Sequence, residues 1–176
     1  SYSAPPETDS LVTVWVFNPD PLTSANEIYG TPYEDAFDQD VVELNAERVS
    51  VQMPVTFEND TFFLRNDYAA IEDFSFPDVE PVFSLTPEFN FTRAESGFED
   101  VNSLYHISYF QQYIRSLGFN NIVDYAISVD PHALGGSDNS NFNPGFNPPR
   151  LSFGEGGVDD AEDADLHDRP VQHPQR

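Results

Sequence analysis

The sequence contains no cysteine and no lysine. Without cysteine, the chain can form neither disulfide bonds nor thiolate metal sites. Without lysine, only seven arginines oppose 31 aspartates and glutamates, and the formal net charge at pH 7 is −24. Such an acidic surface repels phosphate backbones and anionic lipid headgroups. We therefore expect neither nucleic acid nor a membrane among the partners of this chain.

Long apolar runs and a leader pattern are also missing. No stretch has the roughly 20 apolar residues that cross a bilayer, and no basic, apolar and small-residue signal pattern opens the chain. The first residue is Ser1 rather than methionine. We interpret this as a start inside a longer precursor, with a signal and a propeptide upstream.

Aromatic side chains are abundant, with 16 Phe and 8 Tyr among 176 residues. They predict a buried core in one domain, or in one domain and part of another. The many acids allow two compatible interpretations. They form a solvation surface suited to concentrated salt, or some of them bind calcium, which prefers carboxylate and carbonyl oxygens.

Period-two patterns dominate the first half of the chain. Residues 11–17 are apolar on both faces and predict a well-covered strand, and residues 49–57 alternate between apolar and polar and predict another. Pro54 favours an edge strand or a bulge there. The turn residues 58–60 then predict a hairpin into residues 61–64.

Shorter strands are expected over residues 69–74, 79–85 and 88–92, after a long ordered loop over residues 22–47. Residues 1–10 have the proline and polar content of a linker. The sequence thus predicts a linker followed by a β-rich module over residues 11–92.

The period changes to that of a helix at Ser96. Ser96 and Glu99 fit a capping box, apolar residues follow at spacings of three and four, and Gly118 stands where a helix C′ residue belongs. This pattern predicts a helix over residues 96–117. Core packing is expected for three tyrosines on a neighbouring face: Tyr105, Tyr109 and Tyr113.

The second half continues with short strands. Alternation predicts strands over residues 123–129 and 150–153, and a short extended piece over 138–142 within a segment rich in Gly, Asn and Pro. The predicted fold class is therefore α+β.

A segment of glycines and acids, Gly154–Asp165, follows the last strand. It holds three glycines, which permit unusual backbone angles, and six carboxylates that lead toward a helix N-terminus. No helical pattern follows. Residues 166–176 carry two prolines and no apolar periodicity, and we expect them to be a disordered tail.

The segment FGEGGVDDAEDAD, residues 153–165, resembles the one before the zinc helix of thermolysin-like and fungalysin-like zinc metallopeptidases. The predicted helix and the block VDPHALGGSDNSNF extend the resemblance. It implies that residues 93–165 are the N-terminal lobe of a catalytic domain. The family continues with HExxH, which supplies two zinc ligands and the general base. This sequence has no HExxH, so the resemblance implies an incomplete enzyme with no catalytic or zinc-binding residue.

The resemblance also implies a peptide-binding site. In that family the strand matching residues 139–142 lines the active-site cleft, which implies that Asn139 holds a peptide or protein substrate through its side-chain amide and Ser140 through its backbone carbonyl. This is pairing of a peptide with a sheet edge. An Asn-rich turn is the alternative.

Calcium is a further possible cofactor. The resemblance places a structural acid, near calcium, at Asp165, and neighbouring acids could add oxygen ligands, although their spacing is not that of an EF-hand. The candidate ligands are Asp159, Asp160, Asp163 and Asp165, with Glu162 as a further one.

The four histidines predict no zinc site. We expect His106 to be a packed helix residue and His132 a loop residue without a metal. His167 and His173 are six residues apart with a proline between them, so one helix face cannot present both.

Two functions follow. The first is a fragment of a secreted zinc metalloendopeptidase, inactive as it stands, whose unrelated tail suggests a frameshift or a truncated gene. The alternative is a non-catalytic extracellular β-rich binding module that calcium could stabilise.

Overall fold

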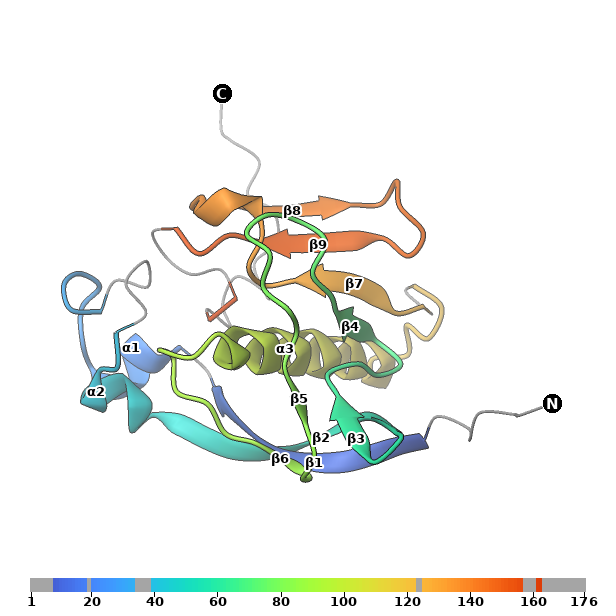
Figure 1. Cartoon of the computed structure of the whole chain (residues 1–176), viewed down its shortest axis with the longest axis horizontal. Helices are drawn as coiled ribbons and strands as arrows, with labels where there is room; N and C mark the ends of the chain where they lie inside the picture. The colour runs from blue at the N-terminus through green and yellow to red at the C-terminus, as the bar shows by residue number, and fades with distance from the viewer. Residues whose placement is uncertain (1–7, 19, 34–38, 123–124, 157–160, 163–176) are drawn as a thin grey trace.

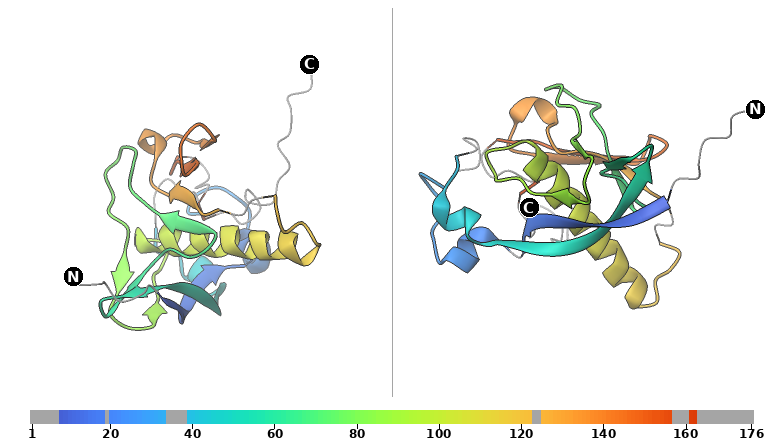
Figure 2. Two further views of the ribbon diagram at one scale, coloured as in Figure 1. Left: turned by 90° about the vertical axis from the view of Figure 1, so that its right-hand side faces the viewer. Right: turned by 60° about the horizontal axis from the view of Figure 1, so that its bottom comes forward.

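Helix α3, Gly97–Ser116, runs between two β-sheets in the computed structural model of the chain (Figure 1). The structure describes residues 8–18, 20–33, 39–122, 125–156 and 161–162. Two sheets with few helices confirm the predicted α+β class. Figure 2 shows the helix between the sheets from two further sides.

The first sheet, called sheet A here, has five strands in the order β5-β3-β2-β1-β6. Its strands are β1 Thr8–Phe17, β2 Arg48–Glu58, β3 Thr61–Phe63, β5 Phe83–Ser84 and β6 Glu88–Phe89. The long strands β1 and β2 pair antiparallel along their whole shared length. The strands predicted over residues 79–85 and 88–92 are thus much shorter than expected.

Strand β1 is covered completely on one face, where Val12, Val14 and Val16 are buried. On the other face Leu11 is 65% exposed, whereas Phe17 is buried. The prediction of a well-covered strand therefore holds at the Phe17 end of the second face and is wrong at Leu11.

Strand β2 lies inside the sheet, but at Pro54 only β1 flanks it, because β3 pairs with Thr56–Glu58 alone. The proline therefore lacks a neighbouring strand on one side, as a residue without an N–H requires. The predicted hairpin follows at once. Asn59 and Asp60 have φ of 49° and 60°, which makes a tight two-residue turn into β3.

Residues 22–47 are not only a loop, because two short helices lie at its ends. They are α1, Pro21–Ala25, and α2, Val42–Asn45. The Asp20 carboxylate accepts hydrogen bonds from the N–H groups of Leu22 and Thr23, which caps α1. Both helices pack beside a small second core, formed by Phe17, Val41, Leu44 and Phe98.

The second sheet, called sheet B here, has the order β4-β7-β9-β8. Its strands are β4 Ala69–Ile71, β7 Ile127–Asp130, β8 Ser140–Asn143 and β9 Arg150–Phe153. Strand β4 pairs parallel with β7, and β7 parallel with β9, whereas β8 pairs antiparallel with β9. A strand of the predicted β-rich module therefore joins the sheet of the later residues. The division into two units at residues 92 and 93 stays a prediction.

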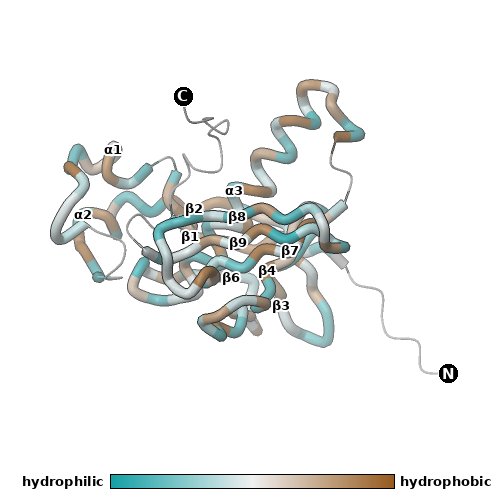
Figure 3. Tube along the Cα trace, turned by 90° about the horizontal axis from the view of Figure 1, so that it is seen from above, coloured by the Kyte–Doolittle hydropathy of each residue, from teal (hydrophilic) through white to brown (hydrophobic). Residues whose placement is uncertain are grey.

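One hydrophobic core joins the two sheets through α3. Val101, Leu104 and Ile107 of the helix pack in one cluster with residues of β1, β2, β4, β7 and β9. The C-terminal part of α3 extends beyond the sheets (Figure 3). Tyr109 and Tyr113 of α3 are 58% and 53% exposed, so the expectation of core packing is wrong for both.

Of the two capping predictions for α3, the one at the C-terminal end is confirmed and the one at the N-terminal end is wrong. Gly118 has φ 92°, as expected for a C′ glycine. The capping box is wrong, because Ser96 itself has helical angles and its side chain makes no capping hydrogen bond. In the described part of the chain, no helix is long and apolar enough to cross a membrane.

We expect Leu104→Ala to lower the free energy of unfolding by about 2–5 kcal/mol, because Leu104 is fully buried where α3 meets both sheets. Urea unfolding followed by Trp15 fluorescence and by far-ultraviolet circular dichroism measures the change. Leu117→Ala is the control, with an effect within about 0.5 kcal/mol, because Leu117 is 55% exposed. Two separated transitions for the two signals would contradict a single core.

Candidate functional site

Strand β8 forms one edge of sheet B, and all four of its residues are exposed. It pairs with β9 in the register Ser140 to Phe153 and Asn143 to Arg150. Among the described residues no strand lies on its other side. The strand therefore presents an open edge.

The backbone groups at this open edge follow from the hydrogen bonds to β9. The Gly154 N–H donates to the Asn139 carbonyl at 3.0 Å, so Asn139 faces β9. Because the direction of the N–H and C=O groups alternates along an antiparallel strand, Asn141 also faces β9. The N–H and C=O groups of Ser140 and Phe142 then point to the open edge, where an extended peptide can pair with them.

Glycines 154 and 156 bring the chain after β9 against the segment that enters β8. A Cβ atom on Gly154 would lie 2.1 Å from the Ser137 carbonyl oxygen, and one on Gly156 would lie 2.6 Å from the Asp138 nitrogen. Neither glycine has a positive φ. They are thus needed for close backbone contact, and the expectation that they supply unusual backbone angles is wrong for these two.

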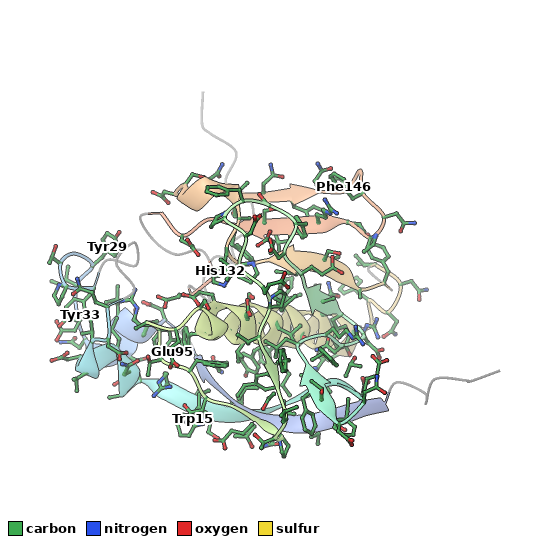
Figure 4. All side chains as sticks on the ribbon, in the orientation of Figure 1. Trp15, Tyr29, Tyr33, Glu95, His132 and Phe146 are labelled. Atoms are coloured by element: carbon green, nitrogen blue, oxygen red, sulfur yellow. The ribbon has the colours of Figure 1, made fainter. Side chains whose placement is uncertain are left out.

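His132 lies beneath this contact, between the N-terminal end of α3 and sheet B (Figure 4). Its Nδ1 atom is 2.6 Å from Oε1 of Glu155, and its Nε2 atom is 3.1 Å from the Ser96 carbonyl oxygen and 3.4 Å from Oδ1 of Asp100. Both ring nitrogens therefore face oxygen atoms that only accept hydrogen bonds. Such surroundings require a hydrogen on each nitrogen, which is the imidazolium form.

The pKa of His132 agrees with this geometry. Burial alone lowers it, but hydrogen bonds with Asp100 and Glu155 and the nearby charge of Glu99 outweigh burial and raise the pKa to about 11. His132 is therefore a buried cation at neutral pH. Asp130 of β7 accepts a hydrogen bond from the His132 backbone N–H and fixes the residue from the other side.

A second buried ion pair holds Glu162 of the acidic segment. Arg93 is fully buried, and its guanidinium lies 3.0 Å from Oε2 of Glu162. The Asn102 side-chain amide donates to the carbonyls of Ala161 and Glu162, while its oxygen accepts from the Phe17 N–H. Helix α3 thus fixes residues 161–162 beside the end of β1.

The guanidinium of Arg150, in contact with two aromatic rings, holds the hairpin formed by β8 and β9. The Arg150 guanidinium lies 4.4 Å from the centre of the Phe74 ring and 4.3 Å from that of Phe146. Phe146 is in the connection between the two strands and is 47% exposed. This stack attaches the far end of the hairpin to the segment after β4, in addition to the glycine contact at the near end.

The structure brings the two predicted peptide-binding residues together at the open edge. Asn139 is exposed just before β8, and Ser140 is the first residue of that strand.

Two of the four histidines lie in the described residues. His106 is packed as predicted, with Nε2 2.8 Å from the Phe17 carbonyl oxygen. His132 lies in the turn after β7, in agreement with the predicted loop position, but it is 2% exposed and part of a charge cluster that no local pattern indicates.

The candidate calcium ligands Asp159, Asp160, Asp163 and Asp165 lie outside the described residues, as do His167 and His173. Glu162, the further candidate, is paired with Arg93 instead.

The described residues do not fit a zinc site. Within the part of the chain that the structure describes, no group of three or more His, Asp or Glu side chains could hold a metal ion. Protonated His132 has no lone pair to offer a metal, because both of its nitrogens carry hydrogen.

No protein-family model matches the chain, and no curated protein matches it. The similarity to thermolysin-like metallopeptidases therefore stays a prediction from the residues.

We expect His132→Gln to lower the free energy of unfolding by about 3–5 kcal/mol, because it leaves buried carboxylates without their cation. The unfolded chain has an ordinary histidine pKa near 6.5 and the folded chain one of about 11. The stabilisation is therefore complete below pH 6.5 and is lost as the pH rises toward 11, by up to about 1.4 kcal/mol per pH unit.

Urea unfolding at several pH values between 6 and 10 measures both effects. The variant should lack this part of the pH dependence. His106→Gln is the matched control, with a loss of about 1 kcal/mol, because it removes one hydrogen bond to a carbonyl. An equal pH slope in His132→Gln and the unsubstituted chain would show that His132 is not the buried cation.

Proposed function

We propose that this chain is part of a secreted zinc metalloendopeptidase of the thermolysin-like or fungalysin-like group, and that strand β8 holds its extended peptide substrate. The observation that carries the proposal is the open edge, where the backbone groups of Ser140 and Phe142 have no neighbouring strand among the described residues. The position agrees with the resemblance. The chain passes from β8 through β9 directly into the glycine and acid segment that resembles the approach to a zinc helix.

In this proposal the chain supplies peptide binding and not the chemistry. The motif HExxH is absent from the sequence, so we expect no hydrolysis by this chain. Binding at a strand edge uses the peptide backbone, and it discriminates little between side chains on the peptide. Asn139 adds a side-chain amide at the start of the edge, where it can bind one peptide group beyond the strand itself.

Backbone pairing predicts a distinctive response to N-methylation of the ligand. In an extended peptide only every second N–H points toward β8. We expect one of two alternately N-methylated versions of a six-residue peptide to lose binding by at least about tenfold, while the other binds like the unmethylated peptide. Fluorescence anisotropy of the labelled peptides measures this, and amide chemical shifts of Ser140 and Phe142 locate the bound peptide.

The two methylated peptides are each other's control, because they have the same composition. Equal affinity of both, or shifts away from β8, would contradict the proposal. No peptide binding together with a calcium-dependent melting temperature would favour the alternative of a calcium-stabilised binding module. The single core that joins both sheets is the observation in favour of that alternative.

Asn139→Ala tests the side-chain contact separately. We expect it to weaken peptide binding about fivefold, because one hydrogen bond at an exposed site is lost, and to leave stability unchanged. The affinity measurement above gives the result. Asn120→Ala, which changes an exposed asparagine after α3, is the control. An unchanged affinity in Asn139→Ala would remove this residue from the site.

A further inference from the structure

Glu155 occupies a special position in the chain, between the two glycines that touch the backbone before β8. Gly154 donates its N–H to the Asn139 carbonyl at 3.0 Å. A Cβ on either glycine would lie less than 3 Å from backbone atoms of residues 136–138. No side chain separates the two segments there, so a shift of residues 154–156 must displace the start of β8.

The Glu155 side chain connects this contact to the core. Its Oε1 atom is 2.6 Å from Nδ1 of His132. His132 is in turn fixed by the Ser96 carbonyl and Asp100 at the start of α3 and by Asp130 of β7. The β8 edge is thereby connected, through one side-chain contact, to the helix on which both sheets pack.

The two partners differ in exposure, which separates their roles. The side chain of His132 is 3% exposed, but that of Glu155 is 30% exposed. Removing His132 uncovers buried charges, whereas removing Glu155 leaves the core intact and lets solvent reach the histidine. The effect of Glu155 is therefore expected mainly at the adjacent strand, with a smaller loss of overall stability than the removal of His132 causes.

We propose that Glu155, held by His132, is a positioning residue that fixes the place of the β8 edge and thereby sets its affinity for peptide. The affinity part rests on the proposed function, and the positioning part does not. A strand that is already fixed binds more tightly, because less conformational freedom is lost when the peptide pairs with it.

Three substitutions at position 155 separate the effect of side-chain length from the effect of charge. Glu155→Ala removes the contact, and Glu155→Asp keeps the charge but is one methylene too short for the 2.6 Å contact. Glu155→Gln keeps an oxygen at the same reach, which still accepts the hydrogen bond from His132. We expect Ala and Asp to weaken peptide binding about tenfold and Gln to restore most of it.

Hydrogen exchange of single amides is the second readout. The N–H groups of Asn141 and Asn143 face β9 by the alternation of the strand, and that of Gly154 bonds to Asn139. Their exchange should become about tenfold faster in the Ala and Asp variants. Exchange in β1 and β2 should change much less, and the melting temperature should fall less than in His132→Gln. Glu58→Ala is the matched control, because it removes an ion pair with Arg65 at the hairpin of sheet A.

The outcomes are separable. Faster exchange at β8 with weaker binding supports the proposal in full. Faster exchange in a chain that binds no peptide supports positioning and refutes the proposed function. Unchanged exchange in the Ala and Asp variants, a Gln variant as impaired as Ala, or exchange that becomes equally faster in β1, β2 and β8 overturns the proposal.

Discussion

The arrangement of this protein depends on one buried cation. The His132 imidazolium has a carboxylate on one ring nitrogen and a carbonyl and a second carboxylate near the other. These oxygens come from the start of α3 and from the segment after β9, and His132 itself follows β7. The charge therefore fixes the end of sheet B onto the helix, at the point where the chain turns toward the open edge. Loss of the proton would leave the buried carboxylate of Asp100 without its cation.

Cationic side chains are scarce in this sequence, and yet the fold buries some of them. The chain has seven arginines and no lysine, yet Arg93 is completely buried, paired with Glu162. Both buried cations hold segments beside the first turns of α3, and Glu99 and Asp100 are buried there as well. Acids at a helix N-terminus are favoured by its dipole. The buried carboxylates of Asp100 and Glu162 thus each lie beside a specific cation, His132 and Arg93 respectively.

The sequence predicts the elements that have a long internal pattern, and fails where distant segments decide. Strands β1 and β2 and helix α3 lie close to their predicted ranges, because seven or more residues of periodicity determine them. Helices α1 and α2 have only four or five residues and no apolar period, although Asp20-Pro21 is a capping signal in retrospect. The place of β4 in sheet B depends on its pairing with β7, more than 50 residues away, which no local pattern encodes. The role of His132 is hidden for the same reason, since its distant partners come from two other parts of the chain, the start of α3 and the segment after β9.

The open edge of β8 poses a physical problem that the net charge helps to solve. An uncovered strand with the uncharged side chains of Ser140, Asn141, Phe142 and Asn143 would readily pair with a second copy of itself. Two chains that each carry a formal charge of −24 repel one another as they approach, and a short peptide without that charge does not. If β8 binds peptide as proposed, the acidity of the chain therefore favours a peptide over another copy at this edge. In concentrated salt this repulsion is screened, so the selectivity then depends on the shape of the edge and on how firmly Glu155 and the Arg150 stack hold it.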